Sequence, residues 1–238
     1  MKFLNIDSPF MQIMNKVADL MILNLLTIVC MIPLITTGAA LTAMHYQVLK
    51  IVRDEECYIV KGYFKAFKEN FWQSTAIWLI MLVLGLVLGG DFYIMRMSET
   101  EFHVIFRAIL GAIAIFTVFT LLFVFPVQAK FANPVFRTIR NALAMSILQA
   151  PKSVVMLVLY VLPMVIVIFV PNVFPLVMLF GMTVPAFLSA KMYNKFFLKL
   201  EDRINEANGA GGGAEQEDDG EKIFHDKLDT TLEEKNIG

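Results

Sequence analysis

Ionisable side chains are the groups best suited to chemistry in this chain, and few of them fall inside its long apolar runs. Asp19 and Asp91 lie near the ends of two such runs, and Lys191 lies near the end of a third. A charge at the centre of a membrane is costly and is often kept for ion or proton transfer. Because no acidic residue falls at mid-run, the sequence argues against a proton-coupled transporter. The histidines map to run boundaries or to the C-terminal region: His45, His103 and His225.

Other recognisable chemical motifs are also missing from the sequence. The segment Gly209–Gly213 is rich in glycine but lacks the lysine and the preceding strand of a nucleotide-binding loop. Two cysteines and three scattered histidines do not form a metal-ligand cluster. No acid/base pair and no nucleophile with a neighbouring base stands out. We therefore predict a protein that is not an enzyme, has no cofactor and has no nucleic-acid partner.

The apolar runs dominate the composition. Hydrophobic residues make up 58% of the chain and charged residues 17%, whereas an ordinary globular domain has about 45–50% apolar and about 25% charged residues. The excess lies in runs such as Ala76–Gly90, Val104–Val127 and Val154–Val170. A soluble protein would have to bury these runs on every side, whereas a bilayer solvates them directly. The sequence thus predicts an all-α fold, a polytopic bundle of transmembrane helices.

A membrane-spanning helix needs about 20 apolar residues, and about five segments come near this length. Ser8 and Pro9 resemble a helix start, and Pro33 ends the first segment because proline cannot continue the helical hydrogen bonds. Pro171 and Asn172 form the turn between the last two segments, which are short enough that a single re-entrant hairpin is an alternative. The predicted spans are about 17–34, 72–94, 104–128, 154–170 and 173–192.

Lysine and arginine set the expected orientation, because they concentrate in the cytoplasmic loops of membrane proteins. They are abundant in Tyr46–Phe71, in Ala129–Ser153 and after the fifth span, so we expect these parts in the cytoplasm and the N-terminus outside. The membrane domain then covers residues 1–203, and residues 204–238 form a flexible acidic cytoplasmic tail. The opposite side carries few basic residues: Lys2, Lys16, Arg96 and Arg107.

A proline followed by small residues interrupts the chain after the first span. Two interpretations fit this pattern. In one, the freed backbone groups of a broken helix line a cavity, as in transporters. In the other, which is favoured, the break is a structural kink followed by a cytoplasmic helix to about Arg53, and the small residues let helices approach closely. The residues concerned are Pro33, Thr37, Gly38, Ala39 and Ala43.

Gly85 and Gly89 form a GxxxG pattern inside the second predicted span. Such a pattern removes side-chain bulk from one face of a helix, so that another backbone can approach it. We interpret it as a packing notch, used either within the chain or between chains. It carries no chemistry of its own.

Two segments of the cytoplasmic loops have the pattern of interfacial helices, with apolar residues on one face and basic residues on another. We expect each either to anchor on lipid or to contact a partner subunit. In the second, Asn133 and Pro134 start a helix with an apolar stripe at Val135, Ile139, Leu143 and Ile147. In the first, the residues concerned are Lys61, Phe64, Lys65, Phe67, Lys68 and Phe71.

A short apolar and basic island interrupts the acidic tail. It contains Ile223, Phe224 and Leu228. A short apolar motif in an otherwise disordered segment can bind a partner and become ordered on binding. The tail either docks through these residues or stays unstructured, and the sequence does not separate the two.

The segments Asn24–Leu26, Pro33–Ala43 and Phe64–Phe71 resemble the YesL-like family, bacterial membrane proteins built on a domain of unknown function. The resemblance covers nearly the whole membrane domain and excludes the tail. It implies a protein of the bacterial cytoplasmic membrane, with genes that often lie beside those of carbohydrate ABC importers. It supplies no catalytic or binding residues.

Two functions follow as expectations. The first is a non-enzymatic accessory subunit of a carbohydrate ABC-type uptake system, which would contact the permease or the ATPase through its cytoplasmic loops and tail while the lipid bilayer surrounds its spans. The second is a stand-alone transporter of small solutes that uses the break in the first helix as its site.

Overall fold

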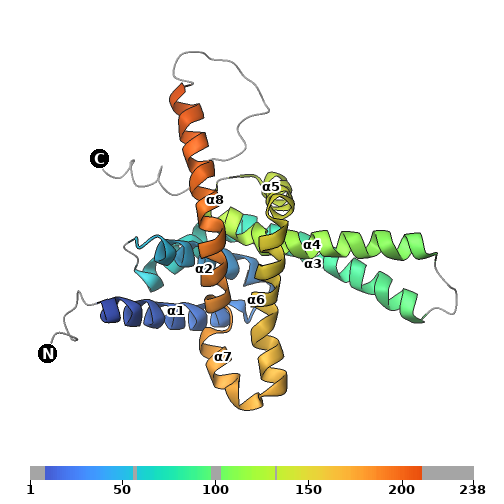
Figure 1. The fold of residues 1–238 in the computed structure, drawn as a ribbon, viewed down its shortest axis with the longest axis horizontal. Coiled ribbons are helices and arrows are strands. Elements are labelled where there is room, and N and C mark those ends of the chain that lie inside the picture. Colours follow the sequence, from blue (N-terminus) through green and yellow to red (C-terminus); the bar gives the residue numbers. More distant parts are fainter. Residues whose placement is uncertain (1–8, 56–57, 98–102, 132, 211–238) are drawn as a thin grey trace.

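A computed structural model describes residues 9–55, 58–97, 103–131 and 133–210, and the regular structure of this part of the chain is helical. Figure 1 shows the arrangement of the helices. They are α1 (Pro9–Met31), α2 (Thr37–Val52), α3 (Ile59–Met97), α4 (Val104–Lys130), α5 (Val135–Leu148), α6 (Ala150–Phe169), α7 (Phe174–Phe180) and α8 (Thr183–Ala210), with short 3-10 turns η1 (Leu34–Thr36) and η2 (Pro171–Val173).

Four of the described helices are long and apolar enough to cross a membrane: α1, α3, α4 and α6. The segment formed by η2 and α7 passes the same test together with α8, although the pair is bent by 54°. The protein is therefore a helical polytopic membrane protein with four or five candidate spans, as the sequence predicted. The last helix differs in length from the expectation, because α8 continues past Met192 and Arg203 to Ala210.

Prolines account for the start of most of these helices. Proline has no backbone N–H to leave unpaired in the first turn, and its φ angle already suits a helix. Pro9 begins α1 and Pro134 immediately precedes α5, as the sequence suggested. Pro151 and Pro175 lie in the first turns of α6 and α7. The boundaries of these elements are thus set locally.

The helices do not form a simple parallel bundle. In Figure 1, α6 and α8 run across the direction of α1 and of the α3–α4 hairpin, and the far half of that hairpin extends away from the rest of the molecule. α2 lies at the centre, where it packs against α1, α3, α4 and α8. Twelve of its residues are buried. The sequence predicted this helix and its end near Arg53, but not its central position.

Close contact between α2 and α3 depends on Gly38. A Cβ atom on Gly38 would collide with the backbone oxygen of Ser74 and would lie 2.7 Å from the Cβ of Trp78. Thr42, one turn further along α2, shares a hydrogen bond of 2.8 Å with the hydroxyl of Ser74. The small residues of α2 therefore act as the sequence suggested, by letting two helix backbones come together.

Side chains satisfy the backbone groups freed by the break at Pro33. The Thr36 hydroxyl lies 2.6 Å from the carbonyl oxygen of Cys30 and 2.8 Å from that of Pro33. The indole N–H of Trp78 donates to the carbonyl oxygen of Leu34 at 2.9 Å. The carbonyl groups at the break are thus hydrogen-bonded, and Gly38, which follows, is packed against α3. This is the geometry of a structural kink.

The first segment expected to be an interfacial helix, Lys61–Phe71, is instead the beginning of α3 and continues without interruption into the span. Its buried face consists of Tyr63, Ala66 and Asn70, which recur at helical spacing, while Phe64 is 41% exposed. The aromatic residues therefore do not share one inward face. Sequence spacing alone missed this because α2 covers the Tyr63 face of the helix, and Tyr63 lies 3.4 Å from the Ala40 carbonyl oxygen.

An ion pair joins the first half of α1 to the segment after α2. Lys16 contacts Asp54, a residue whose φ of 57° lies in the left-handed region. The chain thus returns along α2 toward the beginning of α1. The charge-based topology places Lys16 and the Tyr46–Phe71 loop on opposite sides of the membrane, and that arrangement does not fit this contact.

We predict that Gly38→Ala lowers the stability of the protein by about 1–3 kcal/mol, because the added methyl group must displace the α3 backbone or the Trp78 side chain. Thermal unfolding of the purified protein in detergent measures this change. Gly85→Ala is the matched control, since nothing lies within 4 Å of a Cβ at that position. Equal melting temperatures for the two variants would contradict the close α2–α3 contact.

Candidate functional site

The last candidate span is broken between α7 and α8, and a side chain from α1 completes the broken backbone. The amide nitrogen of Asn24 donates to the carbonyl oxygen of Met178 at 2.8 Å. Its amide oxygen accepts from the backbone N–H groups of Met182 and Thr183, each at 3.1 Å. The Thr183 hydroxyl in turn donates to the carbonyl oxygen of Leu20 at 3.0 Å. Asn24 is fully buried.

These contacts explain why the bend can exist in an apolar surrounding. A lipid bilayer offers no water to unpaired backbone groups, so a broken helix must find partners within the protein. Asparagine has both a donor and an acceptor on one short side chain, so Asn24 can serve both helix ends at once. In the sequence, Asn24 is a polar residue within an apolar run, three positions before Thr27. A polar residue in such a run is the signal that could have pointed to its role, but it does not indicate the partner.

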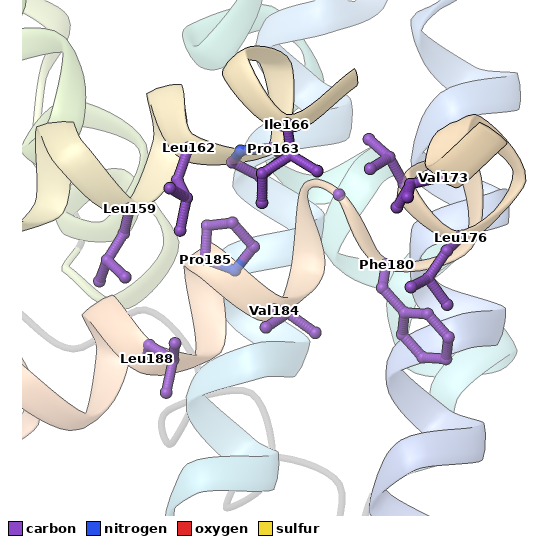
Figure 2. A pocket seen from close by; sticks show the side chains of 12 residues that line it. Leu159, Leu162, Pro163, Ile166, Val173, Leu176, Phe180, Val184, Pro185 and Leu188 are labelled. Atoms are coloured by element: carbon purple, nitrogen blue, oxygen red, sulfur yellow. The ribbon is translucent and has the colours of Figure 1, made fainter. Parts of the chain in front are cut away.

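The bend opens an apolar cleft between α6 and the α7–α8 segment, with a volume of about 370 Å³. Figure 2 shows Leu159 and Leu188 at one end of the cleft, and Val173, Leu176 and Phe180 at the other. None of its lining side chains is polar or charged, so the cleft can accommodate a hydrocarbon chain. A sugar or an ion that entered it would lose its hydration water and gain no hydrogen bonds in return. The lining residues are Leu159, Leu162, Pro163, Ile166, Val173, Leu176, Val177, Phe180, Gly181, Val184, Pro185 and Leu188.

Proline and glycine residues give this cleft its shape. Pro163 lies inside α6, where it removes one backbone hydrogen bond, and Pro185 lies in the first turn of α8. Gly181 stands at the bend, where an added Cβ would collide with the carbonyl oxygen of Val177. The walls of the cleft therefore follow from backbone chemistry as well as from side-chain size.

A second apolar groove, of about 380 Å³, lies between α3, α4 and α5. Three of the four residues in the predicted apolar stripe of α5 line it, namely Ile139, Leu143 and Ile147. Its two threonines, Thr117 and Thr120, donate their hydroxyl hydrogens to carbonyl oxygens of their own helix. This groove is apolar as well, and the stripe of α5 faces α3 and α4.

Polar residues on the same side of the molecule as α5 form a buried network. The Gln128 side chain of α4 donates to the Gln73 amide oxygen of α3 at 2.8 Å and accepts from the Thr138 hydroxyl of α5 at 3.1 Å. Networks of this kind are stabilising when their members are paired. The sequence did not reveal this one, because its members come from three separate helices.

A charged cluster joins α2, α4 and α8. Arg53 makes two hydrogen bonds to the Glu201 carboxylate, at 2.6 and 3.1 Å, and a third to the amide oxygen of Asn194 at 2.9 Å. Lys130 lies 3.7 Å from the same carboxylate. These side chains are mostly shielded from solvent. The two hydrogen bonds between the Arg53 guanidinium and the Glu201 carboxylate form a bidentate ion pair, which is a strong interaction. This pair fixes the direction in which α8 leaves the core.

His45 lies in the core of the protein, whereas its position in the sequence suggested a boundary. Its Nε2 atom is 3.5 Å from the Tyr160 hydroxyl, and its Nδ1 atom has no hydrogen-bond partner among the described residues. The ring is only 5% exposed, in keeping with a structural place in the core.

The remaining predicted site residues have different outcomes. Nothing lies within 4 Å of a Cβ on Gly85 or Gly89, so the described part of the chain does not use this notch. Lys61, Lys65 and Lys68 are exposed on α3. The expected tail-docking residues lie outside the described residues: Ile223, Phe224 and Leu228.

Residues 20–92 match the model of a protein family of unknown function, DUF624. The matched range includes the second half of α1, all of α2 and most of α3, and with them Asn24, the break at Pro33 and the contact at Gly38. No curated protein and no solved structure matches the chain significantly. The match thus covers the packed centre of the molecule and assigns it no activity.

We predict that Asn24→Leu destabilises the protein by about 1–3 kcal/mol, because it leaves buried backbone groups of α7 and α8 without partners. Thermal unfolding in detergent measures the loss. Thr117→Val is the matched control, since it removes a hydroxyl that bonds only to the carbonyl of Ile113 in its own exposed helix. Asn24→Leu should unfold at a clearly lower temperature than Thr117→Val, and equal values would contradict a structural role for Asn24.

Proposed function

We propose that this chain is a non-enzymatic accessory protein of the bacterial cytoplasmic membrane that associates with a carbohydrate ABC-type uptake system. The observation that supports a partner most directly is the set of exposed side chains on α5. Phe136 is 81% exposed and Leu148 is 72% exposed, and Arg140, one helical turn after Phe136, is exposed as well. Exposed aromatic and arginine side chains are enriched where proteins bind one another.

The biological context of this proposal comes from the resemblance to the YesL-like family. Residues 20–92 include the Pro33–Ala43 and Phe64–Phe71 segments that carry the resemblance to the YesL-like family. That resemblance is the source of the link to carbohydrate ABC importers. On this proposal, the permease or the ATPase contacts α5, and the acidic tail takes part from the same side.

Packing around Pro33 supports the accessory role over transport through the first helix break. Thr36 and Trp78 already donate hydrogen bonds to the backbone carbonyl groups freed by the break, so these groups are not open to a solute. Gly38 is covered by α3. Neither of the two grooves described above is lined by residues of this break. Both grooves are apolar, which is the wrong chemistry for a sugar path.

The ion pair between Lys16 and Asp54 bears on the orientation in the membrane. One ion pair cannot join two sides of a bilayer, so the beginning of α1 belongs on the same side as the basic Tyr46–Phe71 loop. Lys and Arg favour the cytoplasm for that loop. Because α2 brings the chain back along α1, the two helices form a hairpin whose ends lie on one side of the membrane. We therefore propose a cytoplasmic N-terminus in place of the outside location that charge counting suggested. The four candidate spans that follow, α3, α4, α6 and the bent α7–α8 pair, then return the tail to the cytoplasm as well.

Single cysteines introduced at Lys16 and Asp54, in a chain whose natural cysteines are replaced by serine, test this orientation. Both should react with a membrane-impermeant maleimide only after the cells are permeabilised. Arg107→Cys is the control, because it lies near the opposite end of the α3–α4 hairpin and should react in intact cells. Labelling of Lys16→Cys in intact cells would contradict a cytoplasmic N-terminus.

Purification from native membranes in a mild detergent tests the accessory role. The wild-type chain should recover components of an ABC transporter, and the double variant Phe136→Ser, Leu148→Ser should recover at least tenfold less, as measured by quantitative mass spectrometry. Phe10→Ser is the control, since Phe10 is also exposed but lies on α1. Recovery without any ABC component, together with sugar flux in liposomes that contain this chain alone, would reject the proposal in favour of a transporter.

A further inference from the structure

The cleft between α6 and α7–α8 is bounded along its length by apolar side chains, and both of its walls belong to candidate membrane spans. Its volume of about 370 Å³ lies within the range of small-molecule sites. Figure 2 shows the lining side chains on the two walls, with Leu159 and Leu188 at one end. The end near Leu159 and Leu188 is the one nearest the beginning of α6.

Beyond that end, each of the two walls carries lysine residues on the same helix face that lines the cleft. On α6, Lys152 precedes Leu159 by two helical turns and lies on the same face as Leu159 and Pro163. On α8, Lys191 and Lys195 continue the face formed by Val184 and Leu188.

A hydrogen bond shows that the basic ends of the two walls are adjacent. The Lys152 ammonium donates to the carbonyl oxygen of Met192 at 3.1 Å, which places its side chain against the α8 backbone one residue after Lys191. Lys191 and Lys195 are exposed, and the Lys191 ammonium lies 4.6 Å from the centre of the Phe187 ring. Lys152 lies in the first turn of a candidate span, and the ends of a spanning helix are where lipid headgroups lie.

We propose that this cleft binds an anionic phospholipid of the surrounding bilayer, with one acyl chain between α6 and α8 and the phosphate on Lys152, Lys191 and Lys195. An apolar cleft whose two walls carry lysines one to two helical turns beyond its end matches a molecule with a hydrocarbon chain and a negative head. Basic pockets between helices on the cytoplasmic side are a recognised form of lipid site. A helix from a partner protein would fill the apolar part but would leave the lysines without an anion.

The site is tested with the full chain, purified in detergent, freed of lipid and mixed with phosphatidylglycerol or phosphatidylcholine of the same acyl chains. Native mass spectrometry measures the lipid that is retained. The wild type should retain phosphatidylglycerol at least tenfold more than phosphatidylcholine. The double variant Lys191→Gln, Lys195→Gln should lose that preference, because it removes the positive charge at the cleft mouth. Lys61→Gln, Lys68→Gln is the matched control, with the same charge change on α3.

A second pair of variants tests the apolar part. Val184→Trp fills the cleft and should reduce the retention of both lipids, whereas Val87→Trp enlarges an exposed residue of α3 and should leave retention unchanged. Equal retention of the two lipids by the wild type would overturn the proposal. Equal loss of preference in both lysine pairs would overturn it too, because it would indicate a net-charge effect, and so would unchanged phosphatidylglycerol retention in Val184→Trp.

Discussion

The hydrogen bonds of Asn24 are the interaction on which the rest of this membrane domain depends. One buried amide pairs with a carbonyl of α7 and with two backbone N–H groups at the start of α8, across a separation of 154 residues or more. Because lipid cannot hydrate a broken helix, the last span could not bend at Gly181 without such a partner. The bend in turn separates α7–α8 from α6 and forms the apolar cleft. A single side chain thus links the first helix, the last span and the candidate lipid site.

Around this contact, polar chemistry is used for structure. The break at Pro33 is completed by Thr36 and Trp78, the α3–α4–α5 junction by Gln128, and the exit of α8 by the Arg53–Glu201 pair. These groups are therefore committed to holding helices at fixed positions. The two grooves that remain are apolar. A protein of this construction suits contact with lipids and with other membrane proteins better than the handling of polar solutes.

The far half of the α3–α4 hairpin differs from the packed centre. Most of its side chains are exposed in the isolated chain, including residues around Gly85 and Gly89, and Figure 1 shows it extending beyond the other helices. An apolar hairpin of this kind is stable in a bilayer because lipid tails replace protein neighbours. The packed part of α3 and its exposed part meet near Trp78, where the beginning of α2 lies against α3.

The sequence by itself determined what depends on neighbouring residues. Hydropathy and run length established a helical membrane protein, prolines indicated the starts of α1 and α5, and the small residues after Pro33 indicated a close helix contact. The tertiary structure alone decided the rest: the central place of α2, the continuation of Lys61–Phe71 into the span of α3, the partner of Asn24 and the contact of Lys152 with α8. The physical reason is that apolar runs and helix caps act over a few residues, whereas each of these features joins side chains from helices that are distant in sequence.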